Sequence, residues 1–106
     1  MLNQKKTLDT IKQYKSNQQI SMLTCYDYVF AQLMDEADID CLLVGDSVGT
    51  NVLGYASEQE VTLADMLHHT KAVARGVQTS FIISDLPYQT YETPEQALQS
   101  AQLLIK

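Results

Sequence analysis

The sequence contains no apolar run that approaches the roughly 20 consecutive residues that a membrane-spanning helix needs. Its first 15 residues are polar and carry lysines, without the apolar segment of a secretory signal. Basic residues are scarce as well: seven Lys and Arg stand against 13 Asp and Glu and are scattered along the chain. A nucleic-acid interface needs clustered Lys and Arg. We therefore expect a cytoplasmic protein with neither a membrane nor a nucleic acid as its partner.

Cysteine is also rare, and the two cysteines form no known motif. Cys25 and Cys41 have apolar neighbours, lack CxxC spacing and have no histidine at the spacing of a metal site. Two buried free thiols fit this pattern. Internal repeats and low-complexity segments are absent, and a hydrophobic content of 45% in 106 residues is ordinary for one small folded domain.

Helical and strand patterns alternate along the chain. Asp27, Thr62 and Thr93 are predicted N-caps, because each precedes a helical pattern; Asp65 completes a capping box, and Pro94 suits a first helical position. The predicted elements are a helix over 8–15, a strand over 20–25, a helix over 28–37, a strand over 41–44, a loop over 50–61, a helix over 63–75, a strand over 80–84 and a helix over 94–105.

Apolar strands that alternate with helices indicate parallel strands joined by right-handed crossovers, so the expected fold class is α/β. Three such strands have two open edges, and the last helical pattern has no stop signal after Leu104 and Ile105. We therefore expect residues 1–106 to be part of one larger domain, either a barrel or a doubly wound sheet.

Two carboxylates are the main candidates for chemistry. Asp46 and Asp85 each follow a buried apolar strand, with Gly45 or Ser84 in between. In parallel α/β folds ligands bind at the carboxyl ends of the strands, where these acids would converge. Two carboxylates suit a hard cation such as Mg²⁺, which could hold a 2-oxo acid and stabilise an enolate. The alternative is that each aspartate only caps a helix or a turn.

Other polar residues near the strand ends give weaker signals. Ser47 lies in a glycine-flanked turn and could hold a substrate carboxylate, but the sequence lacks the G-x-S-x-G pattern of a hydrolase nucleophile. No histidine is placed to activate it: His68 and His69 lie mid-helix and are expected on a helix face or in solvent. Tyr26 could line the site or simply pack, and Asp27 could contribute only a cap.

Five segments carry a more specific signal. They read T-C-Y-D-Y at 24–28, L-V-G-D-S-V-G at 43–49, V-T-L-A-D-M-L-H-H-T at 61–70, D-L-P-Y at 85–88 and T-P-E-Q-A at 93–97. They resemble T-A-Y-D-Y, L-V-G-D-S-[LV]-G, V-T-x-x-D-M-x-x-H-T, D-L-P-[FY] and T-P-E-Q-A of the ketopantoate hydroxymethyltransferase family. Each match is weak alone, but all five occur in family order with family spacing.

The resemblance implies a (β/α)₈ TIM barrel that begins with an extra helix, of which residues 1–106 would cover that helix and about three βα units. It implies transfer of a hydroxymethyl group from 5,10-methylenetetrahydrofolate to 3-methyl-2-oxobutanoate, giving 2-dehydropantoate in pantothenate and coenzyme A biosynthesis. Asp46 and Asp85 would be Mg²⁺ ligands, and Asp46, Ser47 and Asp85 would contact the keto acid. The intact family member is a homo-oligomer, a decamer.

Three departures from the family pattern qualify these implications. Cys25 replaces an alanine, and A-S-E-Q-E at 56–60 replaces D-S-T-L-P, so this loop is expected to have a different shape. The family's substrate-binding lysine, third acidic metal ligand and glutamate general base would all lie beyond residue 106. Lys106 falls in the last helix and does not take the role of that lysine. No catalytic residue is therefore expected within this chain, and the 106 residues alone are expected to be inactive.

Two alternatives stay open from the sequence. Another Mg²⁺-dependent barrel, such as a lyase of the phosphoenolpyruvate/pyruvate group, would share the strand-end acids, although D-L-P-Y together with T-P-E-Q-A disfavours it. The other alternative is a truncated, non-catalytic chain that binds partners through exposed sheet edges. A turnover assay separates an enzyme from such a chain.

Overall fold

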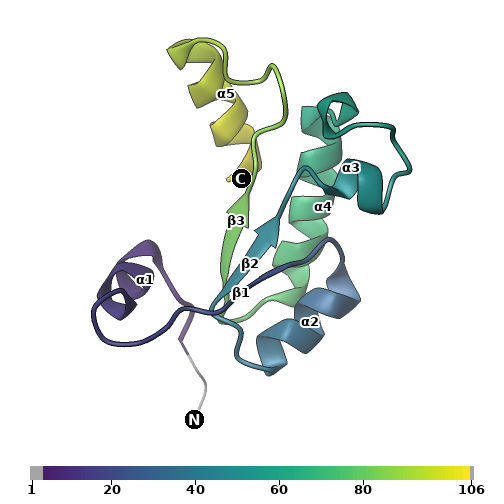
Figure 1. The fold of residues 1–106 in the computed structure, drawn as a ribbon. Helices are drawn as coiled ribbons and strands as arrows, with labels where there is room; N and C mark the ends of the chain where they lie inside the picture. Colours follow the sequence, from purple (N-terminus) through teal and green to yellow (C-terminus); the bar gives the residue numbers. More distant parts are fainter. Residues whose placement is uncertain (1–3, 106) are drawn as a thin grey trace.

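The computed structural model describes residues 4–105, so Lys106 lies outside the described residues. Three parallel strands form one sheet in chain order, β1 (Met22–Thr24), β2 (Cys41–Val44) and β3 (Phe81–Ser84). The helical segments are α1 (Leu8–Tyr14), α2 (Tyr28–Glu36), α3 (Val48–Asn51), the 3₁₀ turn η1 (Glu58–Glu60), α4 (Leu63–Gly76) and α5 (Pro94–Leu104). Figure 1 shows all three strands pointing the same way, with α1 near their amino ends and α3 beyond their carboxyl ends. The α/β class predicted from the sequence is confirmed.

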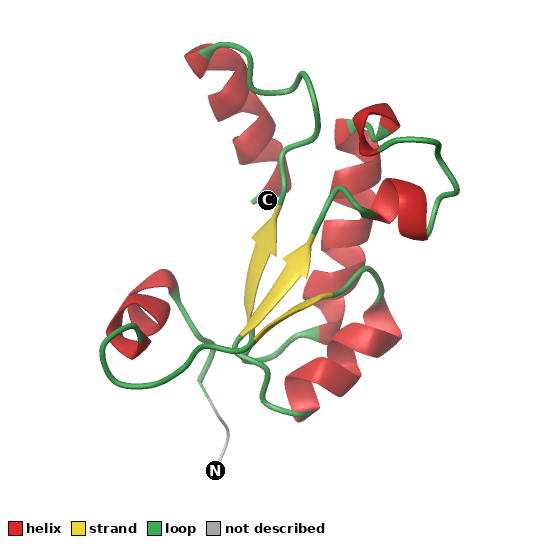
Figure 2. Ribbon diagram, in the orientation of Figure 1, coloured by secondary structure: helices red, strands yellow, loops and turns green. Residues whose placement is uncertain are grey.

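The core lies between the sheet and the pair of helices α2 and α4, which pack together on one face (Figure 2). Leu42 and Val44 of β2 are fully buried, as are Met66 and Val73 of α4 and Ala31 of α2. Alternate residues of a strand share a face, so Leu42 and Val44 both point toward the helices. Their burial supplies much of the apolar contact in the described residues, at roughly 1.5–3 kcal/mol for a fully buried aliphatic side chain.

The two core helices approach closely at Gly76. A Cβ atom built on Gly76 would lie 2.7 Å from the backbone oxygen of Tyr28 and 2.9 Å from the Cβ of Ala31. The sequence pattern places Gly76 just past the helix, but it is the last residue of α4 and a packing contact. Within residues 4–105, no helix has the length and hydrophobicity needed to cross a membrane.

The predicted helix starts are confirmed. The Asp27 carboxylate accepts from the Phe30 N–H at 2.9 Å, and Thr62 and Asp65 form a reciprocal capping box. The Thr93 hydroxyl accepts from the N–H of Gln96. Caps of this kind stabilise by about 1 kcal/mol each, because they satisfy N–H groups that have no partner inside the helix.

Most predicted boundaries agree with the structure within one residue, but the first strand and the loop over 50–61 differ by more. The regular part of β1 is shorter than 20–25, although the Ser21 carbonyl and the Cys25 N–H still bond to β2. The predicted loop over 50–61 includes the end of α3 and the turn η1. It folds back because Gly49 has no side chain: a Cβ there would lie 2.5 Å from Cγ2 of Val61.

Asp35 connects the end of α2 to the segment that leads into β3. Its carboxylate accepts from the N–H groups of Gln78, Thr79 and Ser80 at 3.0, 3.0 and 2.8 Å, and from the Thr79 hydroxyl at 3.1 Å. Partial burial alone would raise the pKa of Asp35, but these donors outweigh it and lower the pKa to about 2.

We expect Asp35→Asn in the intact protein to lower the free energy of unfolding by about 1 kcal/mol at pH 6, because solvent screens a carboxylate that is only partly buried. The pKa of Asp35 is about 2 in the folded state and about 4 when unfolded, so its contribution is full above pH 4 and is lost as the pH falls toward 2. Urea unfolding of both proteins at several pH values measures the difference. Glu36→Gln, at an exposed neighbour, serves as control; a pH-independent difference for Asp35→Asn would contradict the assignment.

Candidate active site

Asp46 and Asp85 lie together at the carboxyl ends of β2 and β3. The parallel register pairs Val44 with Ser84, and the Asp85 N–H continues the ladder by donating to the Val44 carbonyl at 3.0 Å. The Asp46 N–H in turn donates to Oδ2 of Asp85 at 3.1 Å. The structure therefore brings the two predicted acids together, and it places Asp85 directly after β3, because Ser84 is the last residue of the strand.

The site carries uncompensated negative charge. Partial burial raises the pKa of Asp46, and the negative charges of Asp85 and Glu58 raise it further. The ion pairs in residues 4–105 all involve Lys6, at the other end of the sheet, so neither site carboxylate is paired with a cation in the described part of the chain. Such an excess of carboxylate oxygens is the environment that a hard cation would neutralise.

The Ser47 hydroxyl and the Asp85 carboxylate both lie close to Gly45. A Cβ atom built on Gly45 would lie 3.2 Å from the Ser47 Oγ and 3.3 Å from Oδ2 of Asp85, so the two oxygens flank one point above the Gly45 backbone. A side chain at position 45 would therefore crowd both polar groups, which would have to shift by a few tenths of an ångström. The three residues predicted from the sequence as the substrate site, Asp46, Ser47 and Asp85, form one cluster.

The sequence left Tyr26 as either a site residue or a packing residue, and the structure places it beside Ser47, together with Asn51, which was not predicted. The Tyr26 hydroxyl lies 2.7 Å from the Ser47 Oγ, and Asn51 donates to the same tyrosine oxygen at 3.1 Å. Asn51 is four residues after Ser47, a spacing that would have placed both on one helix face. The short helix α3 was not predicted, so this signal was not available.

The histidines have structural positions, as the sequence suggested. His69 bonds through Nδ1 to the backbone oxygen of Tyr26 at 2.8 Å, whereas His68 is exposed. A carbonyl oxygen only accepts, so Nδ1 carries the proton. In residues 4–105 the hydrogen-bond partner of the Ser47 hydroxyl is Tyr26, not a histidine. Asp27 is a helix cap and takes no part in the cluster.

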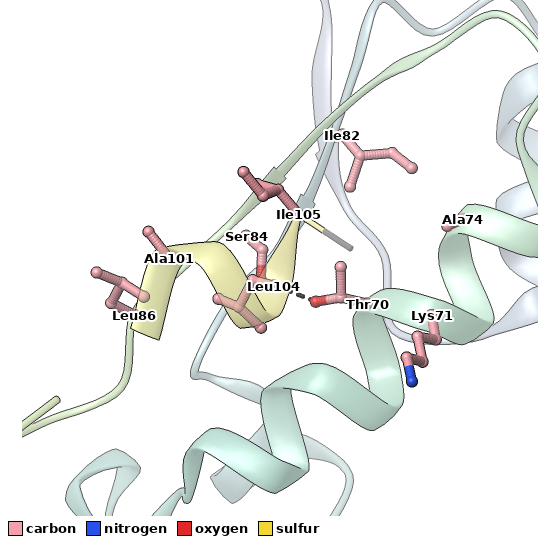
Figure 3. Close-up of a pocket in the computed structure, with 9 residues that line it drawn as sticks. All are labelled: Thr70, Lys71, Ala74, Ile82, Ser84, Leu86, Ala101, Leu104 and Ile105. Carbon is pink, nitrogen blue, oxygen red and sulfur yellow. Dashed lines mark hydrogen bonds between the residues drawn. The ribbon is translucent and has the colours of Figure 1, made fainter. Parts of the chain in front are cut away.

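Two cavities adjoin the end of β3. One, of about 430 Å³, is lined by Asp46, Ser84, Asp85, Leu86 and Tyr91 and holds the paired acids. The other, of about 620 Å³, lies between α4, β3 and α5 and is lined mainly by apolar side chains; Figure 3 shows the Thr70 and Ser84 hydroxyls bonded at 2.8 Å beside it. No carboxylate or histidine of residues 4–105 is among the side chains that line this second cavity.

The donor set is consistent with a cation held by few protein ligands. Residues 4–105 contain no cluster of three or more His, Cys, Asp or Glu that could hold a metal ion. Asp46 and Asp85 thus offer two carboxylates. Mg²⁺ is commonly bound in this way, through one or two carboxylates with waters and substrate oxygens completing its coordination.

Fold and site together define an α/β protein with paired carboxylates at the carboxyl ends of parallel strands, an arrangement suited to an oxygen-rich ligand. The family model of ketopantoate hydroxymethyltransferase matches residues 5–106. The chain therefore belongs to the ketopantoate hydroxymethyltransferase family.

Curated relatives share the name 3-methyl-2-oxobutanoate hydroxymethyltransferase. The chain is 53% identical over 96 residues to the one from Chloroflexus aurantiacus, 54% over 97 residues to one from Dehalococcoides mccartyi and 48% over 108 residues to that from Thermosynechococcus vestitus. The alignments cover 90%, 90% and 100% of this chain but 34%, 34% and 41% of the relatives. The chain thus spans between a third and two fifths of their length.

The crowded position of Gly45 leads to a prediction. In the intact protein, Gly45→Ala is expected to lower turnover by roughly 10- to 100-fold, because its Cβ must displace Ser47 or Asp85 by a few tenths of an ångström. Gly54→Ala is the control: no heavy atom lies within 4 Å of its Cβ position, but its φ of +75° is strained for alanine.

Gly54→Ala should lower the thermal stability and leave turnover unchanged. Gly45→Ala should lower turnover and leave the thermal stability unchanged. Turnover and thermal unfolding of both variants measure the two effects. Unchanged turnover in Gly45→Ala would show that catalysis does not depend on the exact positions of the Ser47 and Asp85 side chains.

Proposed function

We propose that the intact protein transfers a hydroxymethyl group from 5,10-methylenetetrahydrofolate to 3-methyl-2-oxobutanoate and forms 2-dehydropantoate, in pantothenate and coenzyme A biosynthesis. The observation that supports this is the hydrogen bond between the Asp46 N–H and the Asp85 carboxylate, which joins two strand-end acids with Ser47 beside them. Membership of the family supports this choice of reaction. A cytoplasmic location and a homo-oligomeric, decameric assembly belong to the same proposal.

Asp46 and Asp85 would hold a Mg²⁺ ion. Their fit rests on charge: burial and the neighbouring acids raise the pKa of Asp46, and a cation would relieve that cost. When bound, the ion would polarise the keto oxygen and favour removal of a proton from the adjacent carbon. The fixed Asp46 N–H keeps the Asp85 carboxylate in place before any ligand arrives.

Ser47 would bind the carboxylate of the keto acid through its hydroxyl. The Ser47 Oγ and Asp85 Oδ2 flank the space above Gly45, so one small ligand can contact both. The base that removes the proton from the carbon next to the keto group would be a glutamate elsewhere in the intact chain, as the family resemblance implies.

The same proposal includes a closed (β/α)₈ barrel of which residues 1–106 form the first helix and three βα units. Exposed apolar residues on β1 and α2 support it: Met22 is 53%, Leu23 45%, Val29 59% and Phe30 56% exposed. Further βα units would cover them, because a barrel leaves no open edge. We accordingly expect the 106 residues alone to form no 2-dehydropantoate.

Substitution of the acids tests the metal assignment. In the intact protein, Asp46→Asn and Asp85→Asn are each expected to weaken Mg²⁺ binding and to lower formation of 2-dehydropantoate, because each removes a ligand and a charge. Calorimetric titration with Mg²⁺ and a turnover assay measure the two effects. Asp9→Asn, in α1, is the matched control. Unchanged Mg²⁺ dependence in both site variants would defeat the proposal.

A second prediction concerns Ser47. Ser47→Ala is expected to raise the KM for the keto acid by about tenfold while kcat falls less, because a carboxylate held by a hydroxyl is bound equally in the ground and transition states. Steady-state kinetics with varied keto acid separates the two constants. A fall of several orders of magnitude in kcat at constant KM would reveal a chemical role for this serine.

A further inference from the structure

A chain of three polar side chains leads into the site from outside the acid pair. Asn51, at the end of α3, donates its Nδ2–H to the Tyr26 hydroxyl at 3.1 Å, and that hydroxyl lies 2.7 Å from the Ser47 Oγ. The backbone on which Tyr26 sits is fixed in turn, because the Nδ1–H of His69 donates to its carbonyl at 2.8 Å. Tyr26, which follows β1, thus contacts the segment after β2 through Ser47 and Asn51, and helix α4 through His69.

Either hydroxyl of the Tyr26–Ser47 pair can donate, and the Asn51 amide favours the direction in which Tyr26 donates. The Asn51 amide nitrogen can only donate, so the Tyr26 oxygen accepts from it. The tyrosine hydrogen is then free to point at the other close partner, the Ser47 Oγ. With its oxygen already accepting one bond, Ser47 has its own hydrogen left over for a further acceptor.

We propose that Asn51 and Tyr26 are positioning residues, which turn the Ser47 hydroxyl hydrogen toward the carboxylate of a bound 2-oxo acid. This inference rests on the proposed function. The relay runs from the Asn51 amide through the Tyr26 hydroxyl to the Ser47 hydroxyl and ends on the anionic group of the ligand.

The charge of the site explains why such a relay matters. Asp46 and Asp85 are acceptors, and no cationic side chain pairs with them in residues 4–105. Among residues 4–105, cationic hydrogen-bond donors for a substrate carboxylate are therefore scarce. A serine without the tyrosine could rotate and present its lone pairs, which would repel the carboxylate rather than bind it.

A double-mutant cycle tests the relay. In the intact protein with saturating Mg²⁺, Tyr26→Phe is expected to weaken binding of 3-methyl-2-oxobutanoate by roughly tenfold, measured by calorimetry. In a Ser47→Ala background the same substitution should have no further effect, because the group that it orients is gone. Equal losses in both backgrounds would overturn the proposal. Should Tyr26→Phe fail to fold, Asn51→Leu, at an exposed position, completes the same cycle.

Reversal of the relay gives a second test. A carboxylate at position 51 can only accept, so Asn51→Asp draws the tyrosine hydrogen away and makes Ser47 donate to Tyr26. Asn51→Asp should therefore weaken keto-acid binding more than Asn51→Leu does, and the excess should disappear in a Tyr26→Phe background. An excess that persists there is plain charge repulsion and contradicts the relay.

These experiments separate the relay from the proposed function. If the unsubstituted protein neither binds the keto acid nor forms 2-dehydropantoate, the proposed function is wrong. If it does both and the cycles are additive, only the relay is wrong. Thermal unfolding of each variant shows whether a loss of binding reflects a loss of structure.

Discussion

The parallel register of β2 and β3 is the constraint on which the rest of the site depends. It pairs Val44 with Ser84 and so places Asp85 beside Gly45, where its carboxylate accepts the Asp46 N–H. A slip of one residue would turn Asp85 toward the helices and bring Ser84 to the site, because neighbouring residues of a strand face opposite sides. The buried side chains of Leu42 and Val44 oppose such a slip, since it would move both out of the core.

The short helix α3 begins just after this strand end and shapes the polar groups around it. Gly49 lets Val61 come close, and the chain between them folds back over the end of β2. The same helix carries Asn51 to the Tyr26 hydroxyl, so the first and second strands are joined by side chains as well as by the ladder. Here the packing of a loop, rather than a strand, decides which polar groups meet.

Two partly buried aspartates, Asp35 and Asp46, have pKa values shifted in opposite directions. Asp35 is surrounded by backbone N–H donors and has a pKa of about 2, so its charge stabilises the segment before β3. Asp46 instead faces other acids, and its pKa is raised. The charge of the first carboxylate thus contributes to folding, whereas burial and the neighbouring acids disfavour the charge of the second.

Much of this protein could be predicted from local sequence. Asp27, Thr62 and Thr93 mark helix starts because a cap depends only on residues within one turn. The alternation of apolar strands with helices predicts the parallel sheet, and the position of Asp46 and Asp85 after two such strands predicts their meeting. In each case the relevant spacing is fixed by one strand or one helix.

The sequence by itself thus determined the α/β class, the parallel strands and the acid pair, since these follow from periodicity and from residues close in the chain. Only the tertiary structure decided that Gly76 is a helix contact, that Asp35 holds the segment before β3 and that Tyr26 and Asn51 meet at Ser47. These contacts join separate elements, and their geometry depends on how α2, α3 and α4 pack, which no local pattern encodes.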